Sequence, residues 1–467
     1  MRLFFTLAVF VIVSHSQGQN KQLLYNVNGL PQTLLLNPGA NIDFDGHVGL
    51  PFFSGIHFAV GSSGVTAYDV FEDSPNINQR ITNTMRRLTH KDYFTLHQQL
   101  EIFSLGWKWG RDKYISTGIY QEADAFSYFP KDPAILAREG NKDYIGVPFD
   151  FSHVSFTGEV LTVYHIGLNR KMDDRITVGA RLKLYSGIFN VESVNNTGTF
   201  LTINTPDGPN YYRHFANDVD IRVNTSGFAS LRDNNTTVQE ATKDLIGRAF
   251  FGGNVGVGVD MGGTYKVRDN IVISGSVLDL GLMWQRDDVE NYTYKGSYQT
   301  DGLEPLFPEL GPDGKAIPYW DIFEDDVDRN LVDETLQESY VTWRPFKMNA
   351  AVEFIFGETF IPCDYRVETN RKHHSKLGVH LFGIKRPQDV KFALTTYYDR
   401  KFNSNLRMKV SYTLDDYSFS NVGLLLSTRL KSFNFYLAAD NLIGYFNLAK
   451  SNYQSVQLGF QFIINKK

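Results

Sequence analysis

The sequence predicts an all-β protein: a transmembrane antiparallel β-barrel of about 14 strands with an irregular N-terminal segment and one short helix. Three observations lead to this prediction. The chain begins with an export signal, it has no later apolar run long enough for a spanning helix, and its apolar residues alternate with period two. Only helices and closed barrels satisfy every backbone polar group in lipid, so the exported chain is a barrel or a soluble β protein.

Residues 1–18 have the composition of a cleavable signal peptide. Arg2 supplies a positive charge, residues 3–13 form an apolar run, and the small residues Ser14 and Ser16 precede a polar stretch. The run is about half of the ~20 residues that a spanning helix needs, which favours a signal over a membrane anchor. We therefore expect export to the cell envelope.

Residues 19–52 are expected to form the irregular N-terminal segment. Pro31, Pro38 and Pro51 argue against a central strand, because proline cannot donate to a hydrogen-bond ladder. The run 34–36 is too apolar for a free tail. A barrel of about 14 strands has a lumen that wall side chains alone do not fill. The segment is therefore expected to fold into or across the lumen, with a position along the periplasmic rim as the alternative.

One short helix is expected within residues 74–90. Ile77, Ile81, Met85 and Leu88 fall on one face of a helix of this register. We expect this helix to cover one end of the barrel.

The remainder of the chain, residues 53–467, is assigned to the outer-membrane β-barrel. Apolar residues alternate with polar or small ones in six clear windows, at residues 175–184, 254–261, 348–356, 406–414, 421–430 and 456–462. Noisier windows cover residues 93–109, 113–129, 153–169, 199–204, 211–223, 270–284, 378–385, 390–398 and 433–440. The window lengths suit the 9–11 residues of a tilted membrane strand.

Two architectures share this alternation. The apolar face packs inward in a soluble sandwich, whereas in a membrane barrel it contacts lipid and the polar face lines the lumen. The long windows and the aromatic residues of the last window favour the barrel. Leu182 and Phe460 are then assigned to the lipid side and Lys183 to the lumen, where substitution is expected to be milder.

The longest interruption of the pattern, residues 285–340, is expected to be a long acidic loop. It holds 15 Asp or Glu against 4 Lys or Arg, so it cannot lie in lipid, and the longer loops of bacterial barrels are extracellular. The run 324–328 lacks the central glycine and terminal glutamate of a calcium loop. A solvated loop is the preferred interpretation.

Composition and motifs exclude several other classes. The single cysteine, Cys363, cannot form an internal disulfide, a CxxC site or a zinc site, and a net charge of −5 gives no nucleic-acid footprint. The sequence has no GxSxG, HExxH or P-loop motif. We expect a protein that is not an enzyme, with no catalytic, cofactor-binding or metal-binding residues, no cofactor and no nucleic-acid partner.

Several segments resemble an uncharacterised family of Bacteroidota outer-membrane β-barrels, a domain of unknown function. They are residues 30–40, 47–51, 61–64, 291–294, 340–349 and 440–444. That family is distantly similar to FadL-type porins and to the PorV and PorP/SprF barrels of type IX secretion. The distant similarity includes an Asn-Pro-Ala motif, which is Asn37-Pro38-Gly39-Ala40 here, with Gly39 inserted. The resemblance implies a barrel in the cell outer membrane and carries over no ligand residues.

These observations leave more than one function open. The preferred hypothesis is a transport or binding barrel for a small apolar ligand. The alternative is a structural or secretion-accessory barrel that holds a protein partner at the outer membrane, and a soluble exported β protein is less favoured. Outer-membrane lipid and the barrel-assembly machinery are the expected partners, together with a possible protein partner in the envelope.

Overall fold

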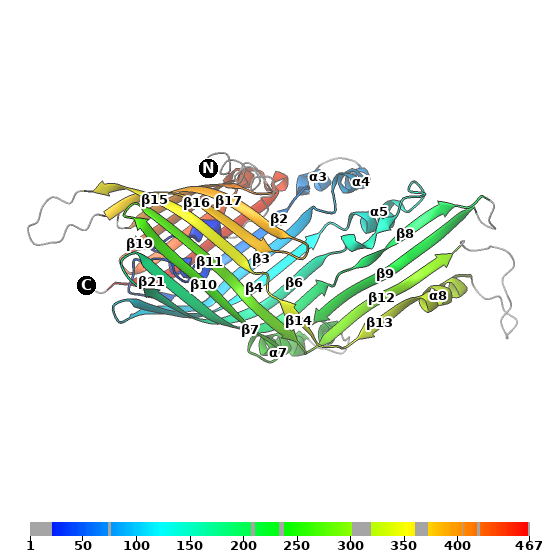
Figure 1. Ribbon diagram of the computed structural model, residues 1–467, viewed down its shortest axis with the longest axis horizontal. Coiled ribbons are helices and arrows are strands. Elements are labelled where there is room, and N and C mark those ends of the chain that lie inside the picture. The colour runs from blue at the N-terminus through cyan, green and yellow to red at the C-terminus, as the bar shows by residue number, and fades with distance from the viewer. Residues whose placement is uncertain are drawn as a thin grey trace, which may run out of the picture.

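The chain forms a closed antiparallel β-barrel with 14 strand positions, which confirms the predicted fold class (Figure 1). The computed structural model describes residues 21–72, 76–206, 211–232, 238–300, 319–359, 372–403, 405–417 and 421–465. The expected signal peptide, residues 1–18, lies outside this range. The ring closes because the last strand, β21 (Tyr453–Ile464), pairs with both pieces of the first strand, β1 (Gly46–Gly49) and β2 (Ile56–Ser62).

The other wall strands follow one another around the ring, and β14 and β15 share one position. They are β3 (Tyr93–Trp109), β4 (Lys113–Tyr128), β6 (Phe156–Lys171), β7 (Ile176–Ser193), β10 (Asn254–Arg268), β11 (Ile271–Gln285), β14 (Tyr340–Trp343), β15 (Lys347–Thr359), β16 (Lys372–Lys385), β17 (Val390–Lys401), β18 (Leu406–Leu414), β19 (Asn421–Leu430) and β20 (Phe433–Asp440). Tight turns such as those from β3 to β4 and from β10 to β11 lie at one end, here called the turn end. Among the described residues, the longer connections lie at the opposite end, the loop end.

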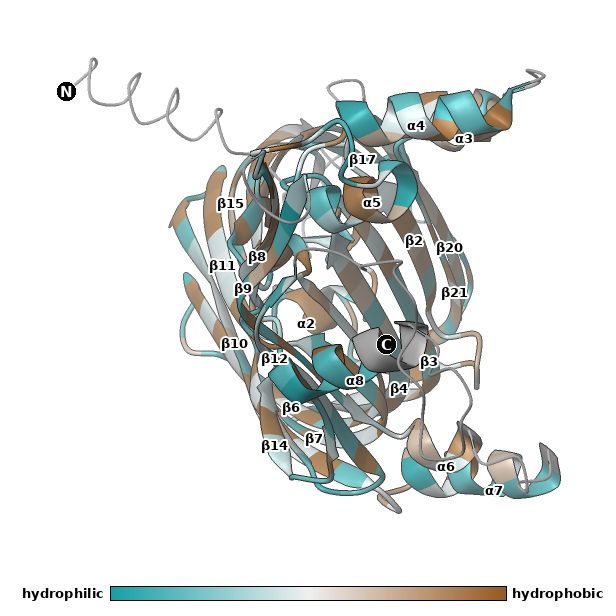
Figure 2. Cartoon of the chain, turned by 90° about the vertical axis from the view of Figure 1, so that its right-hand side faces the viewer, coloured by the Kyte–Doolittle hydropathy of each residue, from teal (hydrophilic) through white to brown (hydrophobic). Residues whose placement is uncertain are grey.

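The apolar side chains of the wall point outward. On β7, the side chain of Leu182 is 61% exposed outside the barrel, whereas that of Lys183 is 3% exposed and lies inside. Exposed apolar residues continue around the ring, among them Val257, Ile273, Phe354, Leu377 and Phe462. Figure 2 shows hydrophobic and hydrophilic residues alternating along the wall strands. The inward-packed apolar face of a soluble sandwich is therefore excluded.

Beyond the loop end, the sheet continues as a lateral extension (Figure 1). Its strands pair in the order β5 (Phe149–Asp150), β8 (Thr197–Asn204), β9 (Tyr212–Ser226), β12 (Val289–Thr300) and β13 (Leu331–Leu336), and β9 joins them to β7. The expected wall windows 199–204 and 211–223 belong to this extension. The broken first wall strand, β1 and β2, was not among the windows, and β1 begins within the range assigned to the N-terminal segment.

The predicted acidic loop at 285–340 is largely regular structure, which corrects that prediction. It contains β12, β13 and α8 (Tyr319–Asn330), and its last residue is the first of β14. The helix α8 packs against β12 and β13. Residues 301–318 lie outside the described part of the chain. The strands were missed because an extension with neither face buried in a core needs no apolar alternation.

The structure has more helices than the one short helix that the sequence predicted. α4 (Ile77–Arg87) forms within residues 74–90, and further helices occupy the loop-end connections. They are α3 (Ala67–Phe71), α5 (Lys131–Glu139), α6 (Ala229–Arg232) and α7 (Val238–Ala249), with 3-10 turns η2 (Phe151–His153), η3 (Leu442–Phe446) and η4 (Leu448–Lys450). Arg86 of α4 donates two hydrogen bonds of 2.9 Å to Glu139 of α5 and lowers the pKa of that carboxyl. Across the described residues, no helix combines the length and the hydropathy needed to span a bilayer.

Candidate functional site

Residues 21–45, here called the plug segment, lie inside the barrel. The segment contains η1 (Gln22–Leu24) and α2 (Thr33–Leu36). Leu23 and Leu30 are fully buried and belong to one apolar cluster with Leu425 and Tyr436 of the inner wall. The apolar side chains of the segment are therefore buried against inward-facing wall residues.

Wall side chains hold the plug segment mainly through its backbone carbonyls. Arg181 donates to the carbonyl oxygens of Leu34 and Leu35 at 3.1 and 2.7 Å. Other wall residues that donate to plug carbonyls are Asn169, Thr264, Ser276, Lys376 and Lys409. Because every residue has a carbonyl group, no sequence motif in the segment could indicate these contacts.

The Asn-Pro-Gly stretch is the place where the plug segment lies directly on the wall. A Cβ atom at Gly39 would come 2.3 Å from the carbonyl oxygen of Gly262, and one at Gly262 would come 2.2 Å from Oδ1 of Asn37. On the neighbouring strand, a Cβ at Gly179 would come 2.1 Å from the carbonyl oxygen of Pro38. Glycine at these positions permits the close approach of two backbones. The motif that carried the resemblance therefore forms a contact between plug and wall.

We expect Gly262→Val to loosen the plug segment while the barrel still closes. The added side chain has no room, and overpacking of this kind costs about 1–3 kcal/mol. Hydrogen exchange of residues 22–40, followed by mass spectrometry, should speed up accordingly. Gly263→Val is the matched control, since a Cβ there meets its nearest atom at an ordinary 3.4 Å. Equal protection of the segment in both variants would show that this contact does not hold it.

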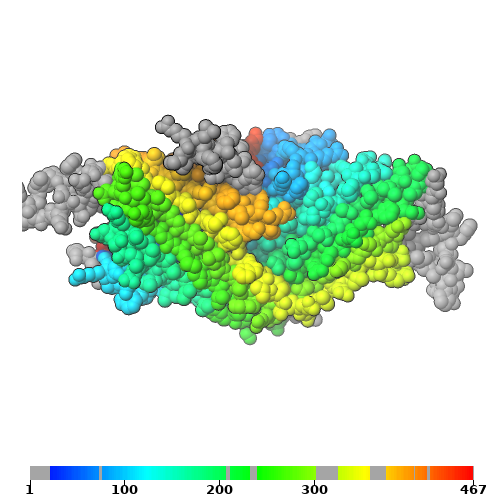
Figure 3. Space-filling view, viewed as in Figure 1, coloured from blue at the N-terminus to red at the C-terminus, as the bar shows by residue number. Residues whose placement is uncertain are grey.

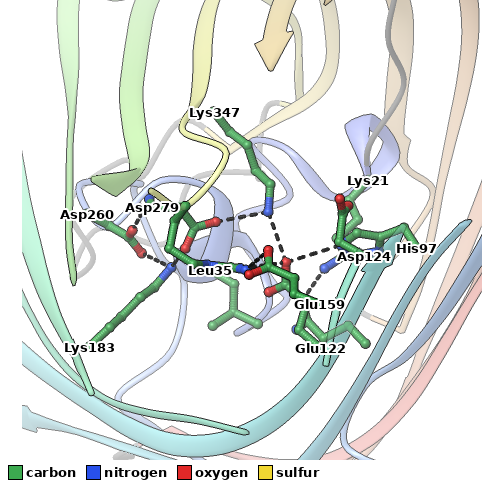
Figure 4. Close-up of polar contacts among 12 residues, drawn as sticks. Lys21, Leu35, His97, Glu122, Asp124, Glu159, Lys183, Asp260, Asp279 and Lys347 are labelled. Carbon is green, nitrogen blue, oxygen red and sulfur yellow. Dashed lines mark hydrogen bonds and ion pairs between the residues drawn. The ribbon is translucent and has the colours of Figure 1, made fainter. Parts of the chain in front are cut away.

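A layer of buried ion pairs lies next to the plug segment (Figure 4). Nζ of Lys183 lies 2.9 Å from Asp260 and 2.5 Å from Asp279. Nζ of Lys347 lies 2.9 Å from Asp279 and 3.2 Å from Glu122. These side chains come from β4, β7, β10, β11 and β15, so the layer connects strands across the lumen. Each charge is buried, but each has at least one partner of opposite sign.

The wall strand is broken beside this layer, between β14 and β15. Pro345 lies in the break and cannot donate to a ladder. The preceding residue, Arg344, directs its fully buried guanidinium inward, where it pairs with Glu159 and donates to Glu122 at 3.1 Å. The guanidinium also lies 5.3 Å from the centre of the Tyr185 ring. The break therefore adds a buried cation to the layer.

A cavity of about 1050 Å³ lies beside the break. Inward-facing residues of its wall include Lys183, Asp279 and Arg344, whereas Leu182 and Leu280 belong to the outer apolar face. The cavity thus contacts both faces of the barrel wall. Figure 3 shows the surface hollowed near the yellow β14–β15 segment, where the orange β16–β17 segment ends. The arrangement provides a space between the lumen and the outer apolar surface.

The charged side chains of the lumen pair with one another, an arrangement that connects strands and does not form a catalytic or metal-binding group among the described residues. Within the ranges that the structure describes, no three His, Cys, Asp or Glu side chains are grouped so that they could hold a metal ion. The carboxylates of the layer are engaged by lysine and arginine side chains. The sequence named no site residues, and the cavity and its ion-pair layer became visible only in three dimensions.

Together these features define a closed β-barrel whose lumen is filled by its own N-terminal segment. The chain belongs to DUF5723, a family of unknown function, which it matches over residues 38–440. A comparison with curated proteins gave no match.

The chain is also similar to several solved barrels. One is the toluene transporter TbuX of Ralstonia pickettii, with 9% identity, coverage of 93% of this chain and 94% of that chain, and a TM-score of 0.41. A Pseudomonas aeruginosa FadL homologue has 10% identity, 97% and 98% coverage and a TM-score of 0.44. The translocator domain of the autotransporter NalP of Neisseria meningitidis has 6% identity, 90% and 88% coverage and a TM-score of 0.27. The fold assignment of this chain rests on its own strand pairings.

Proposed function

We propose that the chain is a non-enzymatic outer-membrane β-barrel that binds a small apolar or amphipathic ligand and passes it between the lumen and the lipid-facing surface. The observation that supports this function is the cavity, because residues of both faces of the wall line it. The plug segment fills the lumen on the other side of the ion-pair layer. A ligand in the cavity therefore has its open route sideways, past the break between β14 and β15.

Placement in the outer membrane is part of the proposal. The outward apolar residues supply a lipid-facing surface, and the polar residues are kept inside. The turn end is then periplasmic and the loop end extracellular, because bacterial barrels have short periplasmic turns. In this orientation the lateral extension projects from the cell, and insertion depends on the barrel-assembly machinery.

We expect the mature protein to fractionate with outer membranes and to migrate faster on a gel when it is not heated. A closed barrel has no free sheet edge, so it resists detergent until heat opens the ring. Membrane fractionation followed by gels of heated and unheated samples measures this directly. Recovery of a soluble periplasmic monomer without detergent would contradict the placement.

Ligand binding at the cavity can be measured through Trp343, which lines the cavity and is 77% exposed. We expect a brominated alkane in lipid nanodiscs to quench Trp343 at lower mole fractions than it quenches the other tryptophans. The difference between the wild type and Trp343→Phe isolates the signal. If the Trp343 signal follows simple partition into lipid, the cavity does not take an apolar ligand.

A second candidate function is a barrel that holds a protein partner. The lateral extension favours it, because β13 pairs with β12 along one edge and no pairing is seen for its other edge among the described residues. A stoichiometric partner recovered with the barrel from native membranes would support this candidate. The similarity to type IX secretion barrels and the Bacteroidota origin remain predictions that belong with it.

A further inference from the structure

We infer that the ligand of the cavity is an amphiphile without net charge, whose headgroup accepts a hydrogen bond from Arg344 and whose apolar chain lies toward the outer face of the wall. The inference rests on the proposed function and specifies the class of ligand. Three independent features of the cavity support it: its charge balance, an unpartnered donor and the position of its apolar residues.

The charges that line the cavity are balanced. The cations are Lys183, Lys385, Arg344 and Arg386, and the anions are Asp124, Asp279, Glu159 and Glu192. Three ion pairs connect these groups, from Lys183 to Asp279, from Arg344 to Glu159 and from Arg386 to Asp124. A ligand with a net charge would bring an uncompensated charge into this buried layer, which is strongly unfavourable. The cavity therefore disfavours both a carboxylate and an ammonium headgroup.

One donor of the Arg344 guanidinium is not used by the protein. Its two Nη atoms contact Glu159 and Glu122, whereas the buried Nε–H has no acceptor among the described residues. A buried donor without an acceptor is unfavourable, so an uncharged oxygen placed there is stabilised. A carboxylate would also accept this hydrogen bond, but it would lie beside the two glutamates that Arg344 already contacts.

The position of the apolar lining residues determines how the bound ligand is oriented. Leu182, Leu184 and Val257 line the cavity and are between 44% and 61% exposed on the outer surface. Trp343, directly before Arg344, also lies on this outer side. A bound amphiphile would therefore have its headgroup at the broken wall strand and its chain along the lipid-facing side.

The experiment compares decane, decan-1-ol and decanoate, each brominated at carbon 5, as quenchers of Trp343 in nanodiscs. Measurements at about pH 9 keep decanoate ionised, since carboxyl groups ordinarily titrate near pH 4. Signals are compared at equal mole fractions in the membrane, with Trp343→Phe as background. We expect half-maximal quenching by the alcohol at a mole fraction about tenfold below that of the alkane. The stabilisation from one hydrogen bond to a charged group accounts for a difference of this size. Half-maximal quenching by the carboxylate should also require a higher mole fraction than half-maximal quenching by the alcohol.

Two outcomes would overturn the inference while leaving the proposed function intact: equal quenching by alcohol and alkane, or quenching by the carboxylate at or below the mole fraction of the alcohol. Quenching by none of the three above background would overturn the proposed function itself. Arg344→Lys keeps the positive charge but removes the Nε donor, so it should lower the preference for the alcohol. Arg407→Lys is the matched control, because Arg407 pairs with Asp399 and does not line the cavity, and it should keep that preference. If Arg344→Lys does not fold, the three-probe series on the wild type still decides.

Discussion

Deletion of residues 21–40 is expected to leave an assembled barrel and to raise its single-channel conductance by at least about tenfold, because the lumen of a 14-strand ring is too wide for wall side chains to fill. The plug segment contributes no strand to the ring before β1, so closure does not depend on it. The wall donors that now hold its carbonyls, such as Arg181 and Lys409, would be solvated by the water that enters.

The conductance is measured in planar bilayers, after a gel of unheated protein has shown that the deleted barrel is closed. A closed barrel with unchanged conductance would show that the plug segment does not block the lumen. Gly262→Val serves as a graded comparison, since it loosens the segment without removing it. Its conductance should lie between those of the wild type and the deletion.

Lys183→Leu is expected to destabilise the barrel as much as Leu182→Arg, for a different reason. A lipid-facing arginine costs about 2–4 kcal/mol near the middle of the membrane. Loss of Lys183 leaves Asp260 and Asp279 with less compensation in a buried layer, and breaking a buried pair costs about 3–5 kcal/mol. The alternation alone predicted a mild effect in the lumen, and the ion pairs reverse that expectation.

The free energy of unfolding in denaturant, measured in lipid vesicles, tests this comparison. Ser411→Ala is the matched lumen control, because the buried Ser411 hydroxyl has no hydrogen-bond partner among the described residues. Its free energy of unfolding should stay within about 1 kcal/mol of the wild type, as for the loss of a weak polar contact. A Lys183→Leu barrel as stable as Ser411→Ala would show that the ion-pair layer contributes no stability.

The barrel and its two faces could be predicted from the sequence because lipid demands a strict alternation. Along residues 176–184 of β7 and along β19, for example, each step of one residue moves a side chain between lipid and lumen. The alternation fails where the wall is irregular or where both faces of a strand lie in water. This is why β1 and β2, separated by residues 50–55, were missed, and why β12 was taken for part of a loop.

The cavity could not be predicted, because its charged residues become partners only when the ring closes. Arg344 and Glu122 lie 222 residues apart in the chain and meet across the lumen. Lys183 was correctly placed on a polar face, but its carboxylate partners depend on the register of β7, β10 and β11. The signal that could have drawn attention to the break was Pro345, directly after an arginine in an otherwise strand-like stretch.

A spin-label scan of β7 in lipid vesicles tests the central claim, a plugged barrel that spans the membrane, most directly. Single cysteines at residues 176, 177, 178, 182 and 184, in a Cys363→Ser background, report access to oxygen from the lipid and to a nickel chelate from water. We predict oxygen access at 176, 178, 182 and 184, and low access to both reagents at 177, where the plug segment lies. Access of the nickel chelate at every position, without a period of two, would contradict the account.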